Sequence, residues 1–194
     1  MRTLLHSVRD VKIFPLWYTE VDGFSFNNNC YFTINLKLQW DDTLKVSFTP
    51  EAACNILWSY TSASSTKNYS LYASTTAWSK YLRYNWWTYN SYITADTKYT
   101  VEITPTWSKR SNSSLDETRT QKTFIADTDM YIGTTSPSAT SSKMVWTIWG
   151  RIKVVERAEL APCKRNSDDV LWYYDLINNV FYTPTTWTPT AVTS

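Results

Sequence analysis

The chain has 194 residues, and 19 lysines and arginines stand against 17 acidic residues, which gives a formal net charge of +2 at pH 7. A chain of this length favours one domain with a single hydrophobic core. The near balance of charge gives no basic footprint for binding nucleic acid or a membrane surface. The apolar runs are too short to span a bilayer, and the charged residues within positions 1–14 argue against a secretion signal. We therefore expect neither nucleic acid nor a membrane among the partners.

The composition favours β-strands over helices. The chain holds 11 Trp and 14 Tyr but only 3 Gly, and it is rich in Ser and Thr. Aromatic and β-branched residues suit a pleated, half-buried surface, whereas Ser and Thr suit solvent faces and turns. No window of ten or more residues shows a helical period, although residues 51–57 are compatible with one helical turn. Turn signals separate short strands at intervals of roughly 8 to 12 residues, which predicts an all-β sandwich or barrel.

The clearest predicted strand covers residues 30–40. Its apolar positions alternate with polar ones and define a core face: Cys30, Phe32, Ile34, Leu36, Leu38 and Trp40. Asp41 and Asp42 then offer turn chemistry, and residues 44–48 alternate again. We interpret the two stretches as a hairpin.

Further strands are predicted along the rest of the chain. The aromatic-rich middle, residues 56–92, reads as several short strands, and residues 99–103 alternate cleanly. Residues 108–120 are charged and polar, which predicts an exposed loop.

The carboxyl-terminal part contains a second strong strand and a hairpin. Residues 143–157 place apolar side chains on one face and basic side chains on the other. Residues 171–174 and 180–183 flank a turn at 175–179, whose two Asn residues tolerate positive φ.

Five segments carry a resemblance to a known domain family. They are Trp149–Arg157, Ala161–Lys164 with its Pro-Cys pair, Trp172–Asp175, Asn178–Tyr182 and, near the other end, Tyr18–Gly23. This pattern resembles the concanavalin-like, laminin-G-like jelly-roll domains of phage virion proteins and gut-bacterial surface proteins. The resemblance implies an all-β, two-sheet antiparallel jelly-roll sandwich. We expect it to span residues 17–194, preceded by an arm or attachment segment over residues 1–16.

The resemblance also implies a function. The expected protein is a non-enzymatic structural component of a tailed bacteriophage virion, of the head-decoration or head-fibre type, assembled in the host cytoplasm. Its expected partners are other virion proteins and further copies of the chain. The arm carries apolar side chains for such contacts: Leu4, Leu5, Val8, Ile13 and Phe14.

Residues for catalysis or metal binding are scarce, and we expect no catalytic residue, metal or cofactor. His6 is the single histidine, and the three cysteines show no zinc-ligand spacing. Cys30 and Cys163 are expected to be buried thiols, Cys163 within a connection between strands. A glycoside hydrolase or lyase stays as a remote alternative, because Asp127 and Asp129 have the spacing to share a strand face. We favour ordinary turn carboxylates over that pair and over a calcium site that also uses Asp168 and Asp169.

The aromatic surplus is the most informative feature for binding. One stretch holds more aromatic surface than one strand face can bury, and its candidate residues are Trp78, Tyr84, Trp86, Trp87 and Tyr89. Alternation along one strand would place Tyr84 and Trp86 on one side, with Trp87 and Tyr89 on the other. Such rings either bury against a neighbouring subunit or form a platform for host or mucus glycans. We favour the subunit contact and keep carbohydrate binding as the alternative function.

Overall fold

The structure is a computed structural model. It describes residues 14–26, 30–39, 41–51, 54–60, 68–76, 79–84, 87–89, 93–104, 107–111, 116–120, 128–133, 146–185 and 188–193. For residues 54, 55, 60, 68–70, 74–76, 79–84, 87–89, 107–111 and 116–120 it describes the backbone and its pairing. Within these ranges the chain forms strands and turns without a helix, so no helix there is long and apolar enough to cross a membrane.

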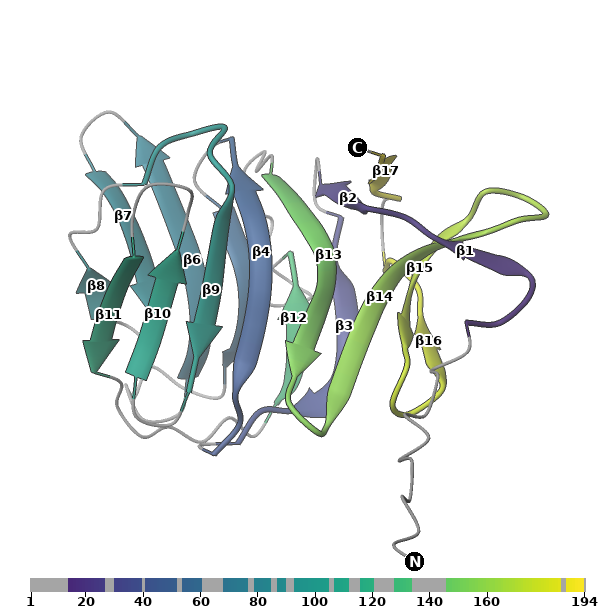
Figure 1. Cartoon of the computed structure of the whole chain (residues 1–194), viewed down its shortest axis with the longest axis horizontal. Coiled ribbons are helices and arrows are strands. Elements are labelled where there is room, and N and C mark those ends of the chain that lie inside the picture. Colours follow the sequence, from purple (N-terminus) through teal and green to yellow (C-terminus); the bar gives the residue numbers. More distant parts are fainter. Residues whose placement is uncertain are drawn as a thin grey trace, which may run out of the picture.

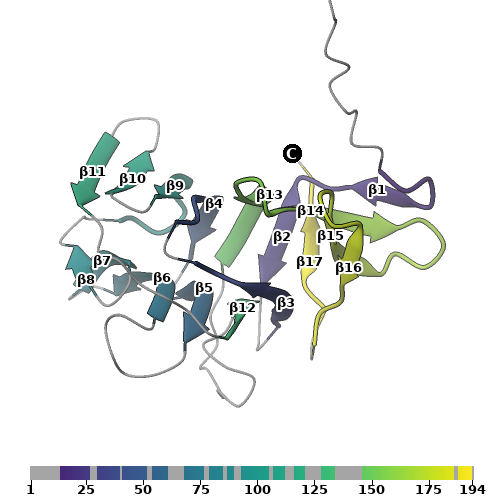
Figure 2. The same ribbon diagram turned by 90° about the horizontal axis from the view of Figure 1, so that it is seen from below.

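Two antiparallel sheets pack as a sandwich, as Figure 2 shows. The eleven-stranded sheet contains β1 (Tyr18–Glu20), β2 (Gly23–Phe26), β4 (Leu44–Pro50), β9 (Tyr99–Ile103), β10 (Trp107–Ser111), β11 (Asp116–Thr120), β13 (Trp146–Val154), β14 (Ala158–Arg165), β15 (Leu171–Asp175), β16 (Val180–Tyr182) and β17 (Thr190–Val192). The six-stranded sheet contains β3 (Phe32–Lys37), β5 (Cys54–Tyr60), β6 (Asn68–Thr76), β7 (Ser79–Tyr84), β8 (Trp87–Tyr89) and β12 (Asp129–Ile132). The predicted all-β, two-sheet antiparallel sandwich is confirmed.

The order of strands explains the extended shape in Figure 1. The large sheet runs β11-β10-β9-β4-β13-β14-β15-β16, with β1 on β14, β2 on β13 and β17 on β2. The small sheet runs β3-β12-β5-β6-β7-β8 and lies behind the β11-to-β13 part of the large one. The hairpin of β15 and β16 therefore extends the large sheet to one side.

Aromatic rings from both sheets fill the core between the layers. Phe24 of β2 stacks on Phe32 of β3, with ring centroids 5.9 Å apart. Tyr173 of β15 packs edge-on against the same two rings, at 4.9 and 4.8 Å. Phe26 stacks on Trp146 of β13 at 4.9 Å. These rings bury most of their surface and contribute much of the apolar area that holds the layers together.

The alternating patterns of the sequence correspond to strands. Phe32 and Ile34 of β3 are buried, and β9 alternates buried and half-buried residues along its length. The predicted hairpin of β15 and β16 is present, with Asp175 opposite Val180. Asn179 adopts a φ of 57°, the left-handed conformation that Asn tolerates.

The predicted hairpin between residues 30–40 and 44–48 is wrong. β3 lies in the small sheet and β4 in the large one, so the connection carries the chain from one layer to the other. The turn chemistry itself is real, because Asp42 accepts a hydrogen bond from the Gln39 N–H at 2.6 Å. Asp42 is also buried rather than solvated.

Two further local predictions are corrected as well. Residues 108–120 contribute β10 and β11, because the edge of a sheet accommodates polar, charged strands. A helical turn was predicted over residues 51–57, but residues 54–57 begin β5.

Pro162 and Cys163, expected in a connection, lie inside β14. Pro162 stands where β14 leaves β13 and begins to pair with β1, and its carbonyl accepts the Val21 N–H at 2.9 Å. A residue without an N–H fits at such an exchange of partners.

Candidate functional site

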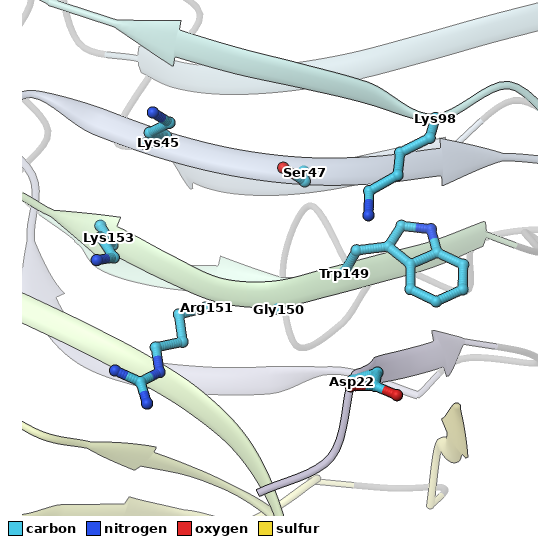
Figure 3. Close-up of a pocket in the computed structure, with 8 residues that line it drawn as sticks. All are labelled: Asp22, Lys45, Ser47, Lys98, Trp149, Gly150, Arg151 and Lys153. Carbon is cyan, nitrogen blue, oxygen red and sulfur yellow. The ribbon is translucent and has the colours of Figure 1, made fainter. Parts of the chain in front are cut away.

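An open hollow lies on the solvent side of the large sheet, over the middle of β13 (Figure 3). It has a volume of about 500 Å³. It is lined by Asp22, Lys45, Ser47, Lys98, Trp149, Gly150, Arg151 and Lys153. We call this feature the Gly150 hollow.

A bulge in β13 creates the hollow. Trp149 pairs with Ser47 of β4 and Lys153 pairs with Lys45, so three residues of β13 stand opposite one residue of β4. On the other side, β2 pairs with β13 only up to Trp149 and β14 pairs with it only from Ile152 onward. The sheet branches at this gap, and the Gly150 N–H donates to the Asp22 carbonyl at 2.7 Å. Bulges of this kind redirect side chains and are common beside functional sites.

Gly150 forms the floor of the hollow. Its φ is 61°, a conformation that strains most side chains, and a Cβ at this position would meet no heavy atom within 4 Å. The space above the backbone is therefore open.

Trp149 forms one wall and is held in a fixed orientation. Its indole Nε1 donates to Thr49 Oγ1 at 2.8 Å. The Lys98 ammonium lies 4.9 Å from the centre of the ring, a cation–π distance. Figure 3 shows the indole and the Lys98 side chain converging from β13 and from the segment before β9.

The opposite part of the hollow is a charged network. The Arg151 guanidinium donates to both carboxylate oxygens of Glu20, each at 2.6 Å, and to Glu159 at 2.9 Å. Lys153 reaches the same Glu159 oxygen at 3.2 Å. The hydrogen bonds from Arg151 to Glu20 raise the pKa of the guanidinium above its usual value. These contacts fix Arg151 and largely neutralise the charges of both basic side chains.

The remaining lining is polar and less constrained. Ser47 shares a hydrogen bond of 2.8 Å with Thr100 across β4 and β9. Lys45 and Lys98 are exposed, and within the described part of the chain neither forms an ion pair with a carboxylate.

A second aromatic cluster covers the outer face of β14, β15 and β16. Tyr18 of β1 stacks obliquely on Phe181 at 4.3 Å, and Trp172 packs edge-on against Phe181 at 5.5 Å. Phe14 packs edge-on against Tyr174 at 5.4 Å. The predicted arm residue Phe14 therefore lies on the sandwich itself.

Two large apolar side chains between Phe14 and β1 are left in solvent. Leu16 is 87% exposed and Trp17 is 77% exposed. Hydrogen bonds hold their backbone, from the Tyr18 N–H to the Pro15 carbonyl at 3.0 Å and from the Asn166 N–H to the Trp17 carbonyl at 2.9 Å. We call Leu16 and Trp17 the apolar edge.

The predicted aromatic residues fall partly within the described residues. Trp78 and Trp86 lie outside them, whereas Tyr84 ends β7 and Trp87 and Tyr89 lie in β8. The predicted single alternating strand is wrong, because β7 and β8 form a hairpin in which Tyr84 pairs with Trp87 and Leu82 with Tyr89. Of the arm residues, Leu4, Leu5, Val8 and Ile13 lie outside the described residues.

The candidate carboxylates do not form a described site. Asp127 lies outside the described residues, and Asp129 begins β12. Asp168 lies in a turn, where hydrogen bonds from Arg165 lower the pKa of its carboxyl group. Among the residues that the structure describes, no three His, Cys, Asp or Glu side chains converge on a metal position.

The residues of the Gly150 hollow were not predicted to form a site from the sequence. Asp22, Lys98 and Trp149 come from three distant segments, and only the fold brings them together. The position of Gly150 could have indicated the site. It is one of 3 glycines in the chain, and it interrupts the alternating pattern of the predicted strand 143–157. A glycine in that position indicates a bulge or a close approach of another group.

No protein-family model matches the chain, and no curated protein matches it either. The function is therefore inferred from the apolar edge, from the pairing in the β7–β8 hairpin and from the Gly150 hollow.

Proposed function

We propose that the chain is a non-enzymatic structural protein of a tailed-bacteriophage virion that assembles through contacts between copies of itself and with other virion proteins. The resemblance of its terminal segments to virion jelly-roll domains motivates this proposal. The observation that supports contact formation is the exposure of Leu16, the last residue of the proposed arm, and of Trp17, which follows it. Exposed Trp is enriched at the centres of protein interfaces, because its burial releases a large apolar area from water.

Particle composition tests the virion proposal. Particles from the cells that make this protein are purified on a density gradient, and peptides of the chain are quantified by mass spectrometry against the major shell protein. We expect the chain to sediment with the particles at a fixed ratio and to resist a high-salt wash. A chain found only in the soluble fraction would contradict the proposal.

Carbohydrate binding is the second candidate function, and one observation favours it. The β7–β8 hairpin brings three of the predicted aromatic positions, Tyr84, Trp87 and Tyr89, to the last two strands of the small sheet. Aromatic residues are suited to stacking on sugar rings, so these two strands are the proposed location of glycan binding.

A glycan array tests this second function. We expect hits on bacterial surface or mucin glycans that weaken in a Trp87→Ala variant but persist in Tyr72→Ala, a substitution in the neighbouring strand β6. An array without hits for the unmodified chain would argue against carbohydrate binding.

A further inference from the structure

We propose that the Gly150 hollow binds an acidic saccharide, a sugar unit that carries a carboxylate as a uronic acid does. This inference rests on the second candidate function and deepens it, because it assigns carbohydrate binding a further site and a ligand class. It does not depend on assembly through the apolar edge.

The hollow has the room that a sugar ring needs. Its volume of about 500 Å³ falls within the range of small-molecule sites. Gly150 leaves the floor open, since a Cβ there would meet no heavy atom within 4 Å. A ligand can therefore approach the backbone of the bulge directly.

Trp149 provides a flat apolar wall for the C–H face of a sugar. The hydrogen bond from its Nε1 to Thr49 Oγ1, at 2.8 Å, fixes the ring before a ligand arrives. A fixed ring loses little conformational entropy on binding, which favours affinity. Asp22 and Ser47, also in the lining, supply oxygen atoms that accept hydrogen bonds from sugar hydroxyl groups.

The basic side chains that line the hollow outnumber Asp22, the acidic residue of the lining, and favour an acidic sugar over a neutral one. Arg151 and Lys153 are occupied by Glu20 and Glu159. Lys98, whose ammonium lies over the indole ring, is an exposed cation without an ion pair among the described residues, and so is Lys45. Ammonium groups next to an aromatic wall suit a ring that carries a carboxylate, because stacking and a charge-assisted hydrogen bond can form together.

Glu102 stands opposite Lys45 in the register of β4 and β9. It partly offsets the charge of Lys45, so Lys98 is the cation on which the proposal chiefly depends. A matched exposed lysine for comparison is Lys37 at the end of β3, in the other sheet.

Binding of three acidic probes tests the proposal: oligogalacturonate, alginate oligomers and hyaluronate oligomers, each followed by tryptophan fluorescence and calorimetry. A neutral galacto-oligosaccharide serves as the comparison ligand. We expect at least one acidic probe to bind roughly ten-fold more tightly than the neutral one, with affinity that falls as salt rises. Lys98→Gln should remove about ten-fold of that affinity, the loss of one charge-assisted hydrogen bond, whereas Lys37→Gln should not change it.

A second variant tests the location without removing a charge. Gly150→Asn keeps a residue that tolerates positive φ and fills the open space above the backbone. We expect it to fold with an unchanged circular-dichroism spectrum and to lose acidic-probe binding.

Three outcomes would overturn the proposal: no binding of any acidic probe, equal binding of the neutral sugar, or full binding by Gly150→Asn. If Trp87→Ala loses acidic-probe binding while Gly150→Asn keeps it, the protein binds carbohydrate at the β7–β8 hairpin. The assignment of the site to the hollow is then wrong.

Discussion

At the scale of single residues, Asp42 joins segments that are far apart in the sequence. Its carboxylate pairs with Arg157 and accepts the Gln39 N–H at 2.6 Å, and Arg157 also donates to the Lys37 carbonyl at 3.0 Å. The Asp42 side chain is 4% exposed, so these contacts are shielded from water. They tie the crossing between the two sheets to the turn between β13 and β14.

Replacing Asp42 should therefore be costly. We expect Asp42→Ala to lower the free energy of unfolding by about 2 to 3 kcal/mol, because it removes charge-assisted hydrogen bonds and leaves a shielded donor unpaired. The exposed neighbour provides the control, and Asp41→Ala should change stability by no more than about 0.5 kcal/mol. Urea unfolding followed by tryptophan fluorescence measures both, and equal stability of the two variants would contradict this role of Asp42.

The buried cysteines lead to a prediction about pH. Burial raises the pKa of the Cys30 thiol from 9.0 to about 12, and burial together with the charge of Glu20 does the same for Cys163. In the unfolded chain both thiols ionise from about pH 9, whereas the folded chain keeps them protonated. The folded state thus binds more protons in this interval, and the free energy of unfolding should fall as pH rises from 9 towards 12.

Two measurements check this prediction in a Cys54→Ser background. Urea unfolding should show a loss of up to about 1.4 kcal/mol per pH unit for each thiol above pH 9, and Cys30→Ala should remove part of that slope. Ellman's reagent at pH 8 should label neither thiol in the folded protein and both in urea. Rapid labelling of the folded protein would show that the thiols are not buried as described.

At the scale of elements, two glycines of the large sheet face different constraints. A Cβ on Gly23 would lie 2.2 Å from the backbone oxygen of Ile148, so β2 approaches β13 too closely for any side chain. Gly150 has open space but a φ of 61°. The first position is limited by contact and the second by backbone conformation.

We expect Gly23→Ala to be the more destabilising change. It should lower the free energy of unfolding by more than about 2 kcal/mol, because the added methyl group forces the paired backbones of β2 and β13 apart. Overpacked cores lose stability for the same reason. Gly150→Ala should cost about 1 to 2 kcal/mol, the strain of a left-handed residue. Thermal unfolding of both variants provides the comparison. A Gly23→Ala variant that is more stable than Gly150→Ala would contradict the described pairing of β2 with β13.

The alternation of apolar residues was enough to predict individual strands but not their partners. Phe32, Ile34 and the residues of β9 alternate because burial of one strand face is a local property of the sequence. The Asp41–Asp42 turn looks the same in a hairpin and in a crossing between sheets, so its chemistry could not decide between them. The partners of β4 are β9 and β13, which are distant in the sequence. The local pattern of residues 41–48 carries no information about them.

The candidate sites differ in the same way. The apolar edge combines adjacent residues, Leu16 and Trp17, yet their exposure depends on how β1 docks on β14. The Gly150 hollow requires Asp22, Lys98 and Trp149 to meet, and only the branching of the large sheet at the bulge achieves this. Residue types alone could indicate aromatic binding surfaces in general but not these positions.

At the scale of the whole molecule, the two layers form a scaffold whose surfaces are available for contact. The small sheet covers one face of the large sheet from β11 to β13, as Figure 2 shows. The outer face of β14, β15 and β16 instead carries its own aromatic cluster. Phe14 packs on Tyr174 of this cluster, and the apolar edge follows two residues later in the chain. The exposed Leu16 and Trp17 stand at the end of the segment proposed to attach the protein to its neighbours.

Sedimentation equilibrium of the purified chain, compared with a Leu16→Ser, Trp17→Ser variant, tests the proposed assembly most directly. We predict that the unmodified chain self-associates over the micromolar range and that the variant sediments as a monomer with unchanged thermal stability, because both side chains are already in solvent. A monomer for both proteins at every concentration, or equal association of both, would contradict assembly through the apolar edge.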